Sequence, residues 1–317
     1  MAEEHVLCWH NIEALRRQVL SFLSPREILR ASSTSRGFRF AAQHVDAISL
    51  VQATPMNTSL AHVARFFRGA RQLRLTQCYL PTDSLHALAT FAHLRDLDLS
   101  DVAFLQDGHV AAITRGASQL TSLTVVSCHL LAHVHIFAPR SLSHVRFERN
   151  MNLKQLQISG DNVVVTHLTV TASATFQQAD ALVHALPSLT HASFAECGML
   201  SRFVLASEHP SLQGLDLSRC HVLLVVDVHT PQLQRLETEG SMQLTHLAVR
   251  SSCLRRLEAC VMLHLQSVAL DCPALVKLNL TGASRLTARG LQLQCPQLKR
   301  LLVHSTSPIH ADDFVHR

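Results

Sequence analysis

A six-residue pattern of leucines and other apolar residues recurs along this chain from residue 45 to residue 303. The pattern is L-x-x-L-x-L, and its clear copies begin at Leu94, Leu120, Leu142, Leu189, Leu212, Leu233, Leu254, Leu275 and Leu298. Weaker copies begin at Val45, Ala70 and Val165, so the chain holds twelve, at steps of 21 to 26 residues. A period of this length is typical of a solenoid, in which each repeat forms one coil and stacks on the next.

Each copy predicts one short β-strand whose paired leucines face the core, because side chains alternate between the two faces of a strand. The intervening x residues would then lie on the open, concave face of the stack. In the longer steps, the apolar spacing between copies predicts helices over 82–93, 107–118, 177–186 and 287–294. In the shorter steps it predicts an extended segment or a tight turn, as on the back of a β-helix, beginning at Leu153, Leu223, Leu244 and Leu265.

Proline and cysteine follow the same register. A proline lies two residues before the first leucine in five copies, at Pro187, Pro210, Pro231, Pro273 and Pro296. Proline suits the point where a coil enters a strand, because inside the strand it would break the hydrogen-bond ladder. Eight residues after the start of five copies, the chain has Cys78, Cys128, Asn150, Cys197 and Cys220.

This register resembles the cysteine-containing leucine-rich repeat, whose Cys or Asn caps backbone groups in the turn after each strand. The resemblance implies an α/β solenoid, a leucine-rich-repeat horseshoe of about twelve coils over residues 45–317. Four ligands must converge to bind zinc, whereas these cysteines are spread one per coil. We therefore expect buried, inert thiols, no metal and no cofactor.

Residues 1–44 do not follow the repeat and predict two short helices. Helical spacing groups the apolar residues between Leu15 and Leu23, and Pro25 then interrupts it. Ser24 as the N-cap and Pro25 at the first helical position favour the start of a second helix, which contains Ile28 and Leu29. A helical segment here has two interpretations: a docking motif, or a cap that covers the exposed end of the solenoid core.

The N-terminal segment resembles an F-box. The apolar block Val19–Leu23 and the turn Pro25-Arg26-Glu27-Ile28-Leu29 match the centre of that family's motif, and Ser35-Arg36-Gly37-Phe38-Arg39 stands for its Cys-Arg-x-Trp-Arg end. Asn11-Ile12 departs from the usual Leu-Pro. The resemblance implies that the adaptor subunit of an SCF-type ubiquitin ligase, and through it the cullin, would contact Ile12, Leu15, Val19, Leu20, Leu23, Pro25, Ile28 and Leu29.

The function implied by both resemblances is substrate recognition in an SCF-type ubiquitin ligase, with proximity and not catalysis as the contribution of this chain. The alternative is a non-catalytic repeat scaffold or inhibitor in a larger complex, with the N-terminal helices serving only as a cap. The sequence holds no phosphate-binding loop, nucleophile elbow or zinc-protease motif, so we expect no enzyme.

The predicted concave face carries two sets of candidate substrate-binding residues. One is a stack of His144, His167 and His191 beside Arg146. Such a stack can bind an anion when protonated, titrate at about pH 6.5 or take a metal, and the alternative is three solvated side chains. The other is a basic series that runs beside Asp216, Glu237 and Glu258 and consists of Arg235, Arg256, Lys277 and Arg300. Because Lys277 and Arg300 have no acidic residue two positions along their own strands, we predict these two as substrate contacts.

Composition narrows the remaining classes of function. The formal net charge is only +5 and aromatic residues make up 5%, which disfavours RNA binding by base stacking. The first residues lack an apolar signal region, and no apolar run reaches the roughly 18 residues of a membrane span. We expect a chain in the cytoplasm, the nucleus or both, with no membrane partner and with reduced cysteines.

Overall fold

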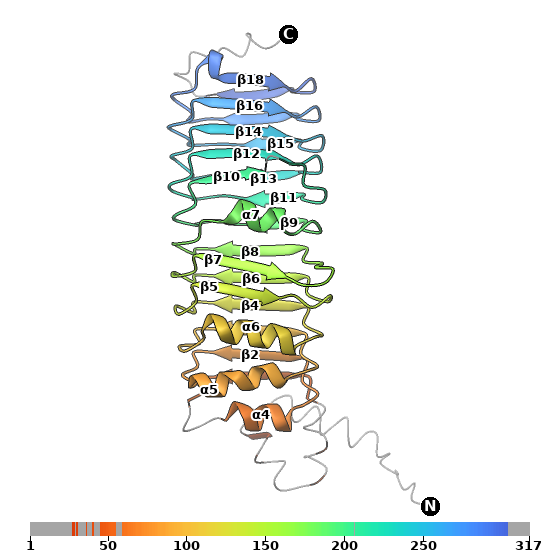
Figure 1. Cartoon of the computed structure of the whole chain (residues 1–317). Helices are drawn as coiled ribbons and strands as arrows, with labels where there is room; N and C mark the ends of the chain where they lie inside the picture. The colour runs from red at the N-terminus through yellow and green to blue at the C-terminus, as the bar shows by residue number, and fades with distance from the viewer. Residues whose placement is uncertain are drawn as a thin grey trace, which may run out of the picture.

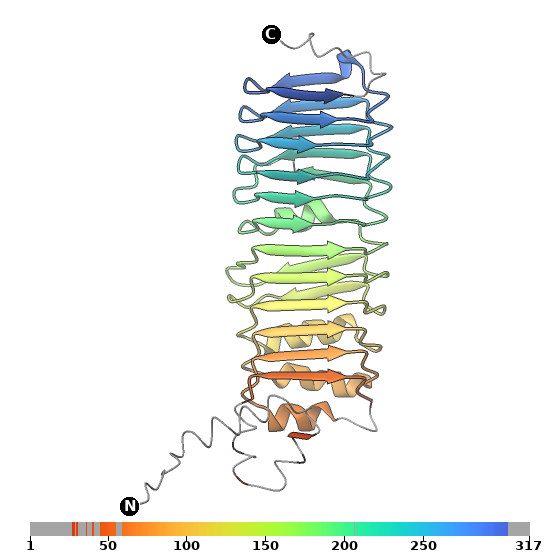
Figure 2. The same ribbon diagram turned by 180° about the vertical axis from the view of Figure 1, so that it is seen from behind.

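A computed structural model describes residues 27, 28, 30, 36, 40, 45–54, 59–205 and 207–303 of the chain. The repeats form a single stack of coils (Figure 1), with the strands of the L-x-x-L-x-L copies side by side along one face (Figure 2). We call this face the front and the opposite one the back.

The front is one parallel sheet of twelve strands, and each predicted copy supplies one of them. Every strand begins two residues after the predicted start of its copy, which confirms the register read from the sequence. In sheet order the strands are β1 (Ala47–Val51), β2 (Gln72–Thr76), β3 (Asp96–Ser100), β4 (Ser122–Val126), β6 (His144–Glu148), β8 (His167–Thr171), β9 (His191–Ser193), β11 (Gly214–Asp216), β13 (Arg235–Glu237), β15 (Arg256–Glu258), β17 (Lys277–Leu280) and β19 (Arg300–Val303).

The back changes from helices to strands along the stack (Figure 1). Its helical elements are α4 (Leu60–Phe66), α5 (Thr82–Leu85), η1 (His86–Thr90), α6 (Asp107–Gly116) and α7 (Ala179–His184). Its strands form two parallel sheets, one of β5 (His133–Phe137) and β7 (Gln155–Ser159), the other of β10 (Arg202–Leu205), β12 (Val225–His229), β14 (His246–Arg250), β16 (Ser267–Asp271) and β18 (Leu291–Gln294).

The predicted back elements are confirmed with one correction. The helices expected within 82–93, 107–118 and 177–186 are present, and the four segments expected to be extended lead into β7, β12, β14 and β16. The helix expected over 287–294 is wrong, because only η2 (Ala288–Gly290) is helical there and β18 follows it. β18 pairs with β16 from Val268↔Leu291 onward, so the neighbouring strand provides a template that local helical spacing does not reveal.

The core consists of stacked aliphatic columns between the front and the back. Along the front sheet the inward residues are in register from coil to coil, as in Leu73↔Leu97 and Leu97↔Leu123, and these leucines are almost fully buried. Burying one such side chain contributes roughly 1.5–3 kcal/mol. Each coil alone would leave this surface open to water, so the fold depends on stacking.

The turn after each front strand has the same backbone geometry in eleven successive coils. The seventh residue after the start of each copy has a positive φ, from 49° at Ala172 to 90° at Gly282. Only two of these eleven residues are glycine, and one of the others is the β-branched Val261 with φ 60°. Left-handed backbone is unfavourable for L-residues, so the stack imposes this conformation on the local sequence.

Five residues of the predicted N-terminal helical motif lie within the described part: Glu27, Ile28, Arg30, Arg36 and Phe40. All five are helical. Ile28 is 4% exposed and belongs to the core cluster, whereas Phe40 is 53% exposed. Among the described helices, none has the length and apolarity to cross a membrane.

Candidate protein-binding surfaces

The cysteine column caps the backbone. We define the capping column as the six residues Cys78, Cys128, Asn150, Cys197, Cys220 and Ser241. All six are buried, and each side chain donates a hydrogen bond to a carbonyl one coil earlier, either within a front strand or directly after it, at distances from 2.8 Å for Ser241 to 3.7 Å for Cys128. Asn150 and Ser241 also accept a hydrogen bond from the main-chain N–H of the capping residue before them.

The capping thiols are unreactive because they stay protonated. Burial raises the pKa of the Cys128 and Cys220 thiols to about 12 and raises that of Cys197 further. A thiol that stays protonated at neutral pH is neither a nucleophile nor a metal ligand. Within the described residues no group of three or more His, Cys, Asp or Glu side chains is arranged to hold a metal ion.

The three front-face histidines form a continuous stack, here named the histidine ladder: His144 on β6, His167 on β8 and His191 on β9. The ring centroids are 4.6 Å and 4.9 Å apart, and neighbouring planes are tilted by only 10° and 8°. All three side chains are exposed. Because imidazole lone pairs lie in the ring planes, near-parallel rings cannot direct three nitrogens to one ion at about 2 Å.

A hydroxyl beside each ring sets the proton position in the ladder. Ring atom Nδ1 lies 2.8–3.0 Å from the hydroxyl oxygen of the preceding residue, which is Ser143, Thr166 or Thr190. Each hydroxyl also donates its single proton to a carbonyl one coil earlier, at 2.9–3.2 Å. The arrangement that satisfies both contacts has Nδ1–H donating to the hydroxyl, which leaves Nε2 of every ring as the group available to a partner.

The ladder resists protonation at its centre. The pKa of His167 is lowered, first by burial and then by the neighbouring charges of His144 and His191. The ladder ends at Gly214 on β11, which has no side chain to stack. A Cβ there would lie 2.8 Å from Cδ2 of the His191 ring, so a larger residue would clash with that ring. A neutral acceptor at Nε2 is therefore the ordinary state of His167 at neutral pH.

The charged residues of the front face pair more than their sequence positions indicate. Lys277 was expected to lack an acidic neighbour, but its Nζ lies 2.7 Å from Oε1 of Glu258 on the adjacent strand. That expectation is wrong because it compared residues along one strand and not across two. Arg146 likewise pairs with Glu148. For Arg300, no ion pair with another described residue lies within 4.0 Å, and its side chain is exposed.

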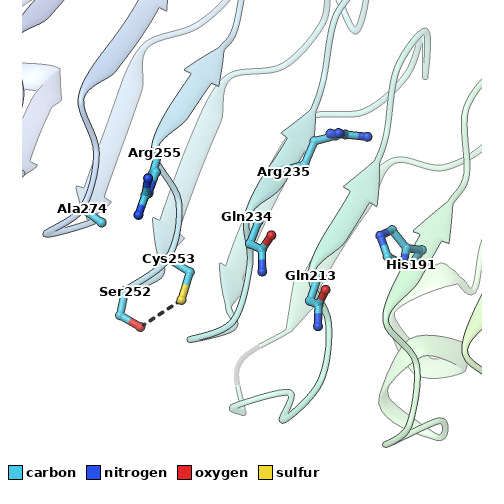
Figure 3. Close-up of a pocket in the computed structure, with 8 residues that line it drawn as sticks. All are labelled: His191, Gln213, Gln234, Arg235, Ser252, Cys253, Arg255 and Ala274. Carbon is cyan, nitrogen blue, oxygen red and sulfur yellow. Dashed lines mark hydrogen bonds between the residues drawn. The ribbon is translucent and has the colours of Figure 1, made fainter.

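An open hollow of about 590 Å³ lies beside the end of the histidine ladder (Figure 3). It is lined by His191, Gln213, Gln234, Arg235, Ser252, Cys253, Arg255 and Ala274. Of the six substrate-binding residues predicted from the sequence, only His191 lines it. Three of the missed residues, Gln213, Gln234 and Arg255, lie directly before strands, a position at which the repeat pattern alone indicates no direction for the side chain.

Two family models match the chain. The F-box domain matches residues 13–48, and the model described as "FBD-associated F-box protein At5g56370, LRR repeats" matches residues 38–178. The chain is an F-box/leucine-rich-repeat protein. The F-box match contains all the predicted adaptor contacts except Ile12. Of these contacts only Ile28 lies among the described residues, and it is buried in the core cluster.

Three solved structures are similar to this F-box/leucine-rich-repeat chain. They are a TLR13–ssRNA13 complex (14% identity, 86% of this chain and 53% of that one, TM-score 0.32), an internalin (inlF) from Listeria monocytogenes (12%, 83% and 88%, 0.30) and the Leptospira interrogans LRR protein LIC12759 (12%, 88% and 88%, 0.31). The chain thus spans about half the length of the first. No curated protein matches it.

The F-box/leucine-rich-repeat chain also has an exposed apolar row that sequence reasoning missed. Nine or ten residues after the starts of eight copies lie Tyr79, Phe104, Leu130, Met151, Met199, Val222, Met242 and Leu263. Each is exposed, from 39% for Val222 to 60% for Tyr79. The available signal was an apolar residue shortly after the capping column, where a turn would ordinarily be polar.

Proposed function

We propose that this chain is the substrate-recognition subunit of an SCF-type ubiquitin ligase. Its F-box would bind the adaptor subunit, and its solenoid would hold a protein substrate on the front face. What supports the proposal is one observation. An F-box domain match is followed directly by a stack of repeats, and the outward side chains of its front strands do not pack in the core.

The structure of the coils determines which side chains are available to a partner. Inward residues fill the core, and the capping column satisfies the turns, so neither is available to a partner. Outward residues of the front strands make no contribution to the core, as the alternating burial of β6 illustrates. A partner bound there would contact side chains that the core does not use.

The proposed contribution to ubiquitin transfer is positional. Holding two reacting partners in one assembly converts an encounter between separate molecules into a step within a complex, and well-oriented cases gain several orders of magnitude in rate. The transferring enzyme would be carried elsewhere in the ligase. The residues of this chain then act by binding, in the cytoplasm or nucleus where such ligases operate.

A second candidate is a scaffold or inhibitor whose N-terminal helices only cap the solenoid. The observation that favours it is the burial of Ile28 in the same core cluster as the first coil, which includes Ile48 and Leu50. A cap buries its apolar residues against the coil that it covers. An adaptor-binding motif keeps some of them exposed.

Co-purification with the adaptor subunit separates these functions. We expect the wild-type chain to retain the adaptor stoichiometrically and the double variant Leu20→Asp/Leu23→Asp to lose it, because two buried carboxylates would oppose an apolar interface. The matched control is Leu130→Asp/Leu224→Asp, two exposed leucines of the solenoid that are 50% and 45% accessible. Thermal melts establish that each variant is folded. Absence of the adaptor from the wild-type sample at micromolar concentration would favour the capping function.

A further inference from the structure

The hollow beside the histidine ladder is lined by residues that begin the front strands or lie up to four residues before them. His191 is the first residue of β9, and Gln213, Gln234 and Arg255 each directly precede the next strands of the front sheet, β11, β13 and β15. With Ala274 before β17, the lining extends over five successive coils (Figure 3). At about 4.8 Å per coil this is a length of about 19 Å.

The lining carries positive charge without a carboxylate. Two arginines and a histidine face the hollow, and none of the lining residues is Asp or Glu. Arg235 lies 3.9 Å from Glu237, a long contact between side chains that are 75% and 52% exposed, which solvent weakens. Arg255 has no ion pair with any described residue, so its guanidinium is available for bidentate binding of an anionic group.

The middle of the hollow offers amides instead of charges. Gln213 and Gln234 occupy the same position on neighbouring coils, and Figure 3 shows both side chains pointing in the same direction. Neither side chain makes a hydrogen bond to another described residue. A glutamine amide presents one acceptor and two donors, which complements the N–H and C=O groups of a peptide backbone.

We propose that this hollow binds an extended peptide segment that runs along the solenoid axis, with anionic side chains held by Arg255 and Arg235. Gln213 and Gln234 would bind its backbone. This inference rests on the proposed function, because the peptide would belong to the substrate. A segment of about six residues in extended conformation spans about 20 Å and so matches the length of the hollow. The anionic group can be a carboxylate or a phosphate, since both accept the same fork of donors from arginine.

Binding of oriented peptide libraries to the purified full chain tests the proposal. Three fluorescent libraries of degenerate peptides are compared by anisotropy, with a fixed central glutamate, phosphoserine or lysine. We expect at least one anionic library to bind tenfold or more tightly than the lysine library. Whether glutamate and phosphoserine bind equally, or phosphoserine alone binds, then identifies the source of the negative charge.

Variants establish where the peptide binds. Arg255→Glu should abolish the preference for the anionic libraries, whereas Arg250→Glu, an exposed arginine at the end of β14 on the back, should leave it unchanged. Gln213→Ala/Gln234→Ala should weaken all anionic libraries together and keep their order. Equal binding of all three libraries, no binding of any, or equal effects of the two arginine variants would overturn the proposal.

The outcome is independent of adaptor binding. The Leu20→Asp/Leu23→Asp variant has an intact hollow and should bind the anionic library like the wild type. A chain that retains peptide but not adaptor would contradict only the ligase function, and the reverse would contradict only the peptide site.

Discussion

Asn150 provides the sharpest test of the capping column. Its side chain is fully buried between two coils, where Oδ1 accepts a hydrogen bond from the main-chain N–H of Cys128 at 2.8 Å and Nδ2 donates to the carbonyl of Val125 at 3.0 Å. Replacement by alanine removes both hydrogen bonds at once. The Cys128 N–H has no other acceptor among the described residues and would remain buried without a partner.

The expected cost follows from the unsatisfied N–H group. Leaving one buried polar group unsatisfied costs roughly 1–3 kcal/mol, so Asn150→Ala should destabilise the protein by about 1–3 kcal/mol. Against a typical total of about 5–15 kcal/mol, this is a large fraction. Ser241 shows that a hydroxyl performs both tasks in another coil, donating to Leu217 at 2.8 Å and accepting from Cys220 at 3.0 Å. Asn150→Ser should therefore recover at least half of the loss.

Hydrogen exchange measured by mass spectrometry reports the effect at its site, and chemical denaturation reports its size. Long repeat stacks can depart from two-state unfolding, so the local measurement is the decisive one. We expect faster exchange of the Cys128 amide in Asn150→Ala and near-normal protection in Asn150→Ser. Asn152→Ala is the matched control, since that exposed side chain makes only one hydrogen bond, to the carbonyl of His129. Unchanged exchange at Cys128 in the alanine variant would refute the capping role.

Two further predictions concern the turns and the buried histidine. Gly282 has φ 90°, and a Cβ there would lie 2.9 Å from Cα of Val261. Gly282→Ala should therefore lower the free energy of unfolding by at least about 1 kcal/mol in denaturant melts. Gly108→Ala, with open space around it in helix α6, is the control and should raise that free energy slightly. His209 is 4% exposed, accepts hydrogen bonds at Nδ1 from two main-chain N–H groups, and has a pKa lowered from 6.5 chiefly by burial. The stability that neutral His209 contributes is complete above pH 6.5 and is lost as the pH falls through the lowered pKa. The melting temperature of His209→Asn should therefore fall less between neutral and acidic pH than that of the wild type. Equal falls in the two proteins would contradict this.

The front sheet could be predicted from the sequence because one period determines every strand. All twelve strands begin at the same offset from their copies, since a shift by one residue would turn the buried leucines outward. The weak copy at Val165 follows the same rule as the strong one at Leu212. Stacking on two neighbours supplies what the local sequence lacks there.

Coil length predicts the back elements more reliably than local apolar spacing. Every coil with a step of 24 residues or more has a helix on its back, and every coil with a step of 23 or fewer has a strand. A helix rises about 1.5 Å per residue and a strand about 3.3 Å, so a helix needs more residues to cross the same width. The step from Leu275 to Leu298 has 23 residues and ends in β18, although its local spacing had indicated a helix.

The binding surfaces were less predictable because they depend on contacts between coils. The stacking of His144 on His167 could be read from the register, since both occupy the same position in their copies. The ion pair of Lys277 with Glu258 joins different positions on adjacent strands, so it depends on how two long side chains bend. The column of Gln213, Gln234 and Arg255 lies before the strands, where the alternation of a strand gives no direction.

The change from helices to strands along the back also explains where an extended peptide can bind. A helix with its side chains is about 10 Å wide, whereas neighbouring strands are about 4.8 Å apart. From β10 onward the back carries strands in register with one another, such as Val226↔Leu247. Gln213, Gln234 and Arg255 belong to three successive coils of this strand-backed part, and each lies directly before its front strand. A row of donors that repeats once per coil at the spacing of neighbouring strands suits an extended chain.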